Sequence, residues 1–121
     1  MTTPKPRPEV LPGTTYKLKT GCGNIYVIIN SDNGKPFEVF SVMGKSGGCS
    51  ASYSEAIARL ISLALRSGVE PKAIIKHLRG IACHQVSWSQ GEKILSCADA
   101  IAKALESHNG LLEKPNPGDP V

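Results

Sequence analysis

The chain has 121 residues, of which 40% are hydrophobic and 20% are charged, a composition that suits one small globular domain and excludes a large catalytic barrel. The formal net charge is +4, but most of the excess lies in residues 1–20, which weakens the case for a nucleic-acid-binding face on the folded body. The longest apolar run, residues 25–29, is too short to cross a bilayer, and residues 1–8 contain no apolar segment that resembles a signal peptide. We therefore expect a soluble, cytoplasmic protein with no membrane contact.

Both ends of the chain are predicted to be tails. Four of the nine prolines lie in residues 1–13 and three more lie in residues 108–121, so we expect a Pro-rich basic tail, a folded domain over residues 14–107 and a flexible C-terminal tail. Within the domain, two β-prone runs at residues 25–29 and 37–43 flank Asn33-Gly34, which predicts a β-hairpin. One face of the second run is expected to carry Phe37, Val39, Ser41 and Met43.

Three helices are expected after the hairpin. The first ends at Ser67-Gly68, the second begins at Pro71 and ends at Gly80, and the third begins with Ser96 and Asp99, whose spacing is like that of a capping box. The fold class is therefore α+β, with a β-hairpin or small antiparallel sheet packed against about three helices. The apolar face predicted for the first helix consists of Ala56, Ile57, Leu60, Ile61, Ala64 and Leu65.

The four cysteines all lie at the ends of predicted elements. Cys22 precedes the first strand, Cys49 precedes the long helix, Cys83 follows the second helix and Cys97 lies in the first turn of the last. Element ends can converge at one pole of a small domain, and four thiolates can hold a tetrahedral zinc ion. Cys49 and Cys97 also lie at helix N-termini, which favour the thiolate form. The pattern predicts a structural zinc site formed by all four residues, and buried, unreactive thiols are the alternative.

Two further hypotheses about function are open: one uses basic residues, and the other uses the cysteines in redox chemistry. Lys72, Lys76 and Arg79 line one face of the second helix, so a nucleic-acid or nucleotide-binding protein that uses them together with the basic tail is the second hypothesis. A redox partner in which Cys49 and Cys97 form a disulfide is the third. The sequence contains no nucleophile elbow, no His-Glu-x-x-His and no carboxylate pair spaced for acid–base work, so no catalytic residue is predicted.

Several segments in order resemble one known family: residues 7–11, 14–17, 20–27, 47–49, 55–66 and 95–102. Together they are similar to the TSCPD domain, found at the C-terminus of many adenosylcobalamin-dependent (class II) ribonucleotide reductases and as free-standing small proteins. The motif Thr-Ser-Cys-Pro-Asp appears here as Leu95-Ser96-Cys97-Ala98-Asp99, and the Cys-Pro expected after the second helix is Cys83-His84. Both departures lose a proline and keep the cysteine, and they leave the role of His84 open.

The resemblance implies an accessory or regulatory module linked to deoxyribonucleotide synthesis. Ribonucleotide reduction needs a large barrel that 121 residues cannot form, so catalysis and cobalamin binding are not expected of this chain alone. The implied partner is a class II ribonucleotide reductase or a related nucleotide enzyme. A homodimer formed through the long helix or Trp88 is the alternative.

Overall fold

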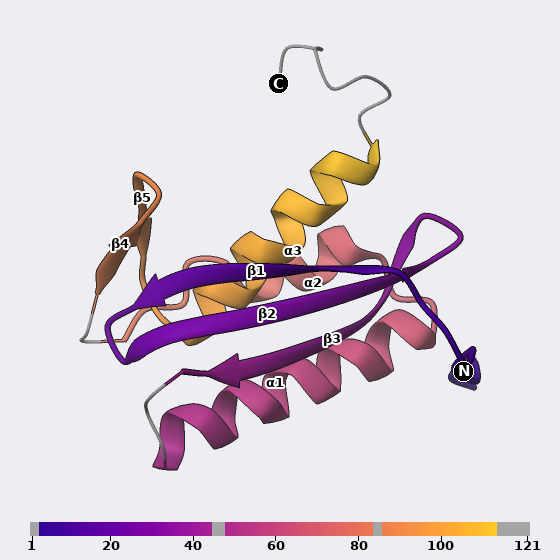
Figure 1. The fold of residues 1–121 in the computed structure, drawn as a ribbon, viewed down its shortest axis with the longest axis horizontal. Helices are drawn as coiled ribbons and strands as arrows, with labels where there is room; N and C mark the ends of the chain where they lie inside the picture. The colour runs from indigo at the N-terminus through magenta and orange to yellow at the C-terminus, as the bar shows by residue number, and fades with distance from the viewer. Residues whose placement is uncertain (1–2, 45–47, 84–85, 114–121) are drawn as a thin grey trace.

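The computed structural model describes residues 3–44, 48–83 and 86–113 (Figure 1). In this part of the chain, three strands form an antiparallel sheet in the spatial order β1-β2-β3, and two short strands form a separate hairpin. With three helices, the predicted α+β class is confirmed. In chain order the elements are β1 (Gly13–Thr20), β2 (Gly23–Asp32), β3 (Lys35–Met43), α1 (Gly48–Arg66), α2 (Pro71–Leu78), β4 (Ser87–Ser89), β5 (Glu92–Ile94) and α3 (Cys97–Glu113).

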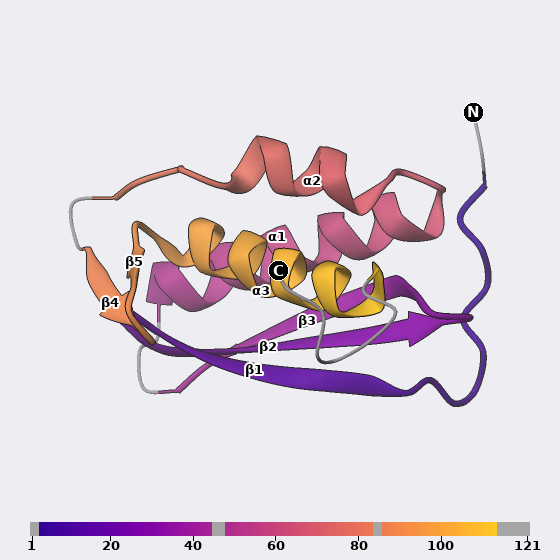
Figure 2. The same cartoon turned by 90° about the horizontal axis from the view of Figure 1, so that it is seen from above.

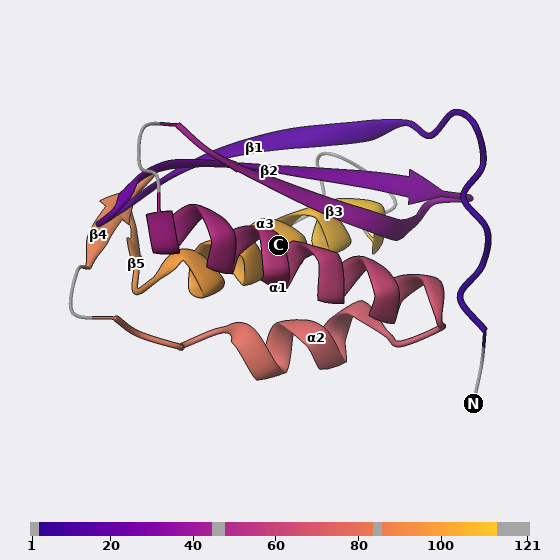
Figure 3. The same ribbon diagram turned by 90° about the horizontal axis from the view of Figure 1, so that it is seen from below.

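The elements are stacked in layers (Figures 2 and 3). The three-stranded sheet forms one side, α1 and α3 cover one of its faces, and α2 lies outside these two helices. The central strand β2 contributes three fully buried side chains to the core, and burial of each contributes about 1.5–3 kcal/mol. The fully buried core side chains with the largest volumes are Ile25, Val27 and Ile29 from β2, Val39 from β3, Ile94 from β5, and Ile101 and Leu105 from α3.

The hairpin predicted around Asn33-Gly34 is confirmed. Asn33 has φ 52° and Gly34 has φ 78°, so both residues are in the left-handed region that a two-residue hairpin turn requires. Asp32 pairs with Lys35 across the turn, and the register shifts between Asn30 and Ser31. Asparagine and glycine tolerate this backbone conformation better than other residues, which is why the dipeptide marks the turn.

Strand β1 was not identified in the sequence. It pairs with β2 along its whole length and directs Tyr16 and Leu18 toward the helices, while Thr15 and Lys17 are exposed. Two apolar side chains among eight residues give little periodic signal, so pairing with β2 rather than local propensity determines the strand. The strands β4 and β5 have three residues each, which is too short to show a detectable alternation of apolar and polar residues.

The predicted core face of α1 was partly wrong. Leu60, assigned to the core, is 66% exposed and Ala56 is exposed as well, whereas Ala58 is 2% exposed and packs inside. The rotation of the helix is fixed by Ser62, whose Oγ accepts a hydrogen bond from Val39 N (2.8 Å) and donates one to Val39 O (3.0 Å) at the edge of β3. Apolar residues cover more than one face of this helix, so their spacing alone does not specify its rotation.

The described part of the N-terminal segment contacts the domain. Lys5 N donates to Arg66 O (2.9 Å) and Arg66 Nε donates to Lys5 O (2.8 Å). The Arg7 guanidinium forms two hydrogen bonds of 2.9 Å with the buried carboxylate of Glu38. At the other end, α3 continues through Glu113, beyond the expected domain end at residue 107. The division into one domain and two tails stays a prediction, but residues 5 and 7 are held against its body.

Candidate metal centre

The first turn of α3 contains the residues of the family motif. Ser96 Oγ accepts a hydrogen bond from Asp99 N (3.0 Å) and donates one to the carbonyl oxygen of Ile81. The predicted N-terminal cap is therefore present. Since Ile81 lies just after α2, the same hydroxyl also holds the segment that follows α2 against the start of α3.

Asp99 joins three parts of the chain at this point. Its fully buried carboxylate accepts hydrogen bonds from Gly80 N (2.9 Å) and Leu95 N (3.0 Å), and it lies 3.1 Å from Lys103 Nζ. Burial opposes ionisation, but these three donors outweigh it and hold the pKa of Asp99 below its usual value of 3.8. The aspartate of the motif thus connects the end of α2 to the start of α3.

Cys97, in the same turn, contacts the turn between β1 and β2. Its Sγ lies 3.9 Å from Thr20 Oγ1, which also accepts a hydrogen bond from Cys22 N (3.1 Å). Burial raises the pKa of the Cys97 thiol; hydrogen bonds with Ser54 and Thr20 oppose this, and the proximity of Cys22 and Cys83 adds to the increase. The expectation that the helix N-terminus would favour the Cys97 thiolate was therefore wrong, because burial has the larger effect.

Cys22 and Cys83 thus both lie near Cys97 at one pole of the fold. Cys22 and Cys97 are half-buried, Cys83 is exposed beside them, and its backbone N donates to Leu95 O (3.0 Å). Cys49 is exposed in the first turn of α1, and that helix reaches the pole through the contact of Ser54 with Cys97. Within the described residues, none of the four forms a disulfide bond. In their present positions, no three His, Cys, Asp or Glu side chains within residues 3–44, 48–83 and 86–113 could hold a metal ion.

The three basic residues of α2 and its C-terminal end are not equivalent. Lys72 and Lys76 are exposed on α2, but Arg79 follows the helix and forms an ion pair with Glu106 of α3 at 3.1 Å. One of the three positive charges proposed for phosphate contact is therefore balanced within the protein. His84 lies outside the described residues.

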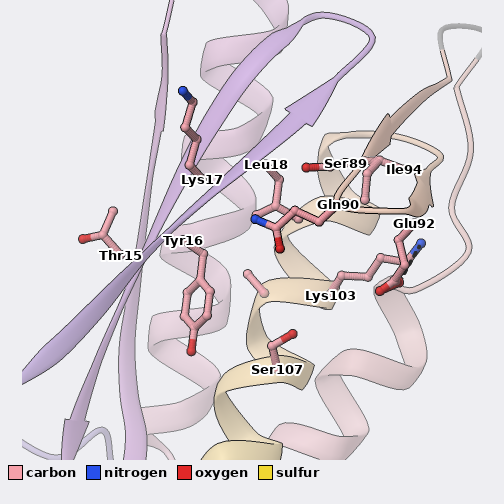
Figure 4. Close-up of a pocket in the computed structure, with 11 residues that line it drawn as sticks. Thr15, Tyr16, Lys17, Leu18, Ser89, Gln90, Glu92, Ile94, Lys103 and Ser107 are labelled. Carbon is pink, nitrogen blue, oxygen red and sulfur yellow. Dashed lines mark ion pairs between the residues drawn. The ribbon is translucent and has the colours of Figure 1, made fainter.

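A polar pocket of about 250 Å³ lies between β1, the β4–β5 hairpin and α3 (Figure 4). Tyr16 and Lys17 line it from the sheet, and Ser107 and Lys103 line it from α3. The Lys103 ammonium contacts Asp99, donates to the backbone carbonyl of Lys93 and lies 3.8 Å from Glu92. Its charge is thus balanced inside the protein, so this pocket has less positive charge than its two lysines suggest.

A buried hydrogen-bonded chain connects the sheet to α3 and was not predicted. Tyr16 Oη lies 3.1 Å from Nδ1 of His108, and Ser31 Oγ lies 2.8 Å from its Nε2. Burial lowers the pKa of His108 and raises that of Tyr16. A neutral imidazole therefore bridges β1, β2 and α3. Because its partners lie 77 and 92 residues away, no local pattern reveals them.

Within the described residues, no helix is both long and apolar enough to span a membrane. No curated protein and no solved structure shows significant similarity to the sequence. The model of the TSCPD domain, by contrast, matches residues 2–109, which include every strand, both Ser96 and Asp99, and all four cysteines. Since this match covers most of the chain, the protein belongs to the TSCPD domain family.

Proposed function

We propose that this protein is a zinc-binding accessory or regulatory module related to class II ribonucleotide reductase and deoxyribonucleotide synthesis, and that it acts in the cytoplasm. The family supports the link to that enzyme, through the reductases to which this domain is fused elsewhere. The metal is supported mainly by one observation: Cys22, Cys83 and Cys97 gather around the N-terminus of α3 although they lie far apart in the sequence.

The proposed ligands are Cys22, Cys49, Cys83 and Cys97. Sulfur donors suit zinc, and when bound the ion would supply a structural cross-link between the β1–β2 turn, α1, the segment after α2 and α3. Cys49 and Cys83 are exposed, so their side chains can turn toward Cys97 without disrupting core packing. A thiol must lose its proton to bind zinc, and burial raises the pKa of Cys97, so zinc affinity should decrease on acidification.

Elemental analysis of the full chain, purified without chelator from a reducing host, tests the metal site. We expect about one zinc ion per chain, and its removal should lower the midpoint of thermal unfolding because the site connects several elements. Cys97→Ser and Cys49→Ser should each reduce zinc retention, whereas Ser50→Ala, beside Cys49, should not. A folded protein with less than about 0.2 zinc per chain and four freely titrating thiols would show that the proposal is wrong.

The proposed partner is tested separately. Tagged protein should recover a class II ribonucleotide reductase or a related nucleotide enzyme when it is captured from its native host. Recovery of the protein alone, with the mass of a dimer by light scattering, would instead assign its exposed surface to self-association. In either case, we do not expect this chain to catalyse ribonucleotide reduction, and we do not expect cobalamin to bind to this chain on its own.

A further inference from the structure

The three-stranded sheet has one face that no helix covers. Helices α1 and α3 pack on the other face, and no other described element lies across this outer face (Figures 2 and 3). Because fully buried side chains alternate with the remaining ones along β2, Tyr26 and Ile28 point outward. In β1 the same alternation separates Tyr16 from Lys17, and these two side chains extend from the strand in opposite directions (Figure 4).

The strand register brings basic and aromatic residues together on this side of the sheet. Lys17 pairs with Tyr26, which in turn pairs with Val42. Ile28 pairs with Phe40, so Tyr26 and Phe40 occupy diagonal positions about 7–8 Å apart. Phe40 is 48% exposed and Val42 is 53% exposed. The outer sheet face is defined here by Lys17 and Lys19 of β1, Tyr26 and Ile28 of β2, and Phe40 and Val42 of β3.

The positive charge of the outer sheet face is not balanced by ion pairs. Lys17 and Lys19 are exposed, and no ion pair within the described residues includes either of them. The acidic residue of β3, Glu38, is 3% exposed and is paired with Arg7. Much of the positive charge at the start of the chain thus lies on the folded sheet and not in a tail.

We propose that the outer sheet face binds single-stranded nucleic acid. Lys17 and Lys19 are two residues apart on β1, which separates them by about 6.8 Å, a spacing that consecutive phosphates of an extended single strand can match. The bases attached to these phosphates would lie over β2 and β3, where Tyr26 and Phe40 offer rings for stacking. Ammonium groups along one strand and aromatic groups beside them match a polymer in which every unit has an anion and a planar base.

Two other occupants fit these groups less well. In a nucleic-acid duplex the faces of the bases are covered by their neighbours, so Tyr26 and Phe40 would have no base on which to stack. A second copy of this chain would bring another Lys17 and Lys19 to the interface, and the outer sheet face has no exposed carboxylate to pair with them.

The binding experiment uses the full chain and a fluorescein-labelled DNA single strand of about 12 nucleotides, with fluorescence anisotropy as the readout. At about 50 mM salt we expect saturable binding with a dissociation constant of about 1–100 µM. Two phosphate contacts predict that the logarithm of the binding constant falls with the logarithm of the salt concentration at a slope of about −1.4.

Three control probes separate stacking from charge. A duplex of the same sequence and an abasic single strand of equal length should each bind at least about fivefold more weakly, because neither offers an unstacked base. RNA of the same sequence should bind within about threefold of the DNA strand, because stacking and phosphate contacts do not use the 2′-hydroxyl.

Variants on the outer sheet face and away from it locate the bound strand. Phe40→Val and Tyr26→Val each remove a ring but keep the preference for a strand, and each should weaken binding by at least about fivefold. Lys17→Gln should reduce the steepness of the salt dependence by about 0.7. The matched controls are Tyr53→Ala, at a 66% exposed ring on α1, and Lys76→Gln on α2, and neither should change the affinity.

Lys17→Gln replaces an exposed side chain, so it tests the proposal independently of any loss of stability when a ring is removed. Absence of saturation at about 0.5 mM protein, or equal binding of the abasic strand, would overturn the proposal. A larger effect of Lys76→Gln than of Lys17→Gln would assign the binding to α2 and would also contradict it. A dimer in sedimentation velocity that Phe40→Val dissociates would assign the face to a second copy. None of these residues is a proposed zinc ligand, so failure of the zinc proposal would leave this test valid.

Discussion

Replacement of Asp99 by asparagine tests whether the motif aspartate holds α2 and α3 together. Asparagine has nearly the same shape, but one of its two terminal groups is an NH₂ donor. In the unmodified protein, the carboxylate accepts hydrogen bonds from Gly80 N, Leu95 N and the Lys103 ammonium. In the variant, the asparagine NH₂ group must point at one or more of these three donors, which then lose their acceptor. Because Asp99 is fully buried, water cannot replace the lost acceptor unless the surrounding structure rearranges.

The expected cost follows from these contacts. A buried donor that loses its acceptor costs about 1–3 kcal/mol, and breaking a buried ion pair by removal of one partner costs about 3–5 kcal/mol. Lys103 keeps a second carboxylate, that of Glu92 at 3.8 Å, so we expect Asp99→Asn to destabilise the protein by about 2–4 kcal/mol. The control is Glu106→Gln, which removes the exposed partner of Arg79 and should cost about 0.5 kcal/mol or less.

Urea unfolding followed by circular dichroism at pH 7 measures both changes. With a denaturant slope of about 1–3 kcal/mol/M, the midpoint for Asp99→Asn should fall by roughly 0.7–4 M. Asp99→Asn combined with Lys103→Met should be less destabilised than Asp99→Asn alone, because the second change removes the cation left without its closest partner. A loss no larger than that of Glu106→Gln would refute the structural role assigned to Asp99.

Two other variants test the N-terminal contact and the buried imidazole. Arg7→Ala removes the guanidinium that contacts buried Glu38, so thermolysin should cleave near residue 10 faster, whereas Lys5→Ala should change little because the contacts of Lys5 use its backbone. The pKa of His108 lies below its usual 6.5 when the protein is folded, so the unfolded chain takes up this proton first and stability should decrease as pH falls below about 6.5. In urea titrations, His108→Gln should lose this pH dependence, and His77→Gln should retain it.

The elements that were predicted correctly depend on local chemistry. Asn33-Gly34 specifies a tight turn because of its backbone conformation, and Ser96 caps α3 through an amide three residues away. Strand β1 and the rotation of α1 depend instead on partners that are distant in the sequence. The hydroxyl of Ser62 bonds to β3, and no periodicity within α1 indicates that contact.

The same distinction applies to the cysteine pole. Each cysteine could be placed at an element end from its neighbours in the sequence, and Cys22 and Cys83 lie close enough to Cys97 to raise its pKa. The protonation of Cys97 could not be inferred in this way. The effect of a helix N-terminus is local, whereas the burial that raises the pKa of Cys97 is tertiary and opposite in sign. Likewise, the hydrogen bond of Asp99 with Gly80 spans 19 residues and has no sequence signature.

The alanine that replaces the motif proline provides a last test. Ala98 is the second residue of α3, where a backbone N–H has no carbonyl partner within the helix, so a proline there removes no helical hydrogen bond. By restricting the unfolded chain, Ala98→Pro should stabilise the protein by about 0.4–1 kcal/mol.

The matched control lies two residues further along the helix. Ala100 N donates to Ser96 O at 2.9 Å, and Ala100→Pro should therefore cost about 3 kcal/mol or more. Thermal unfolding separates the two variants, since one midpoint should rise slightly and the other should fall by many degrees. If Ala98→Pro also lowered the midpoint strongly, the amide or backbone conformation of residue 98 would matter to the fold. That result would show that this helix start does not tolerate the proline of the family motif.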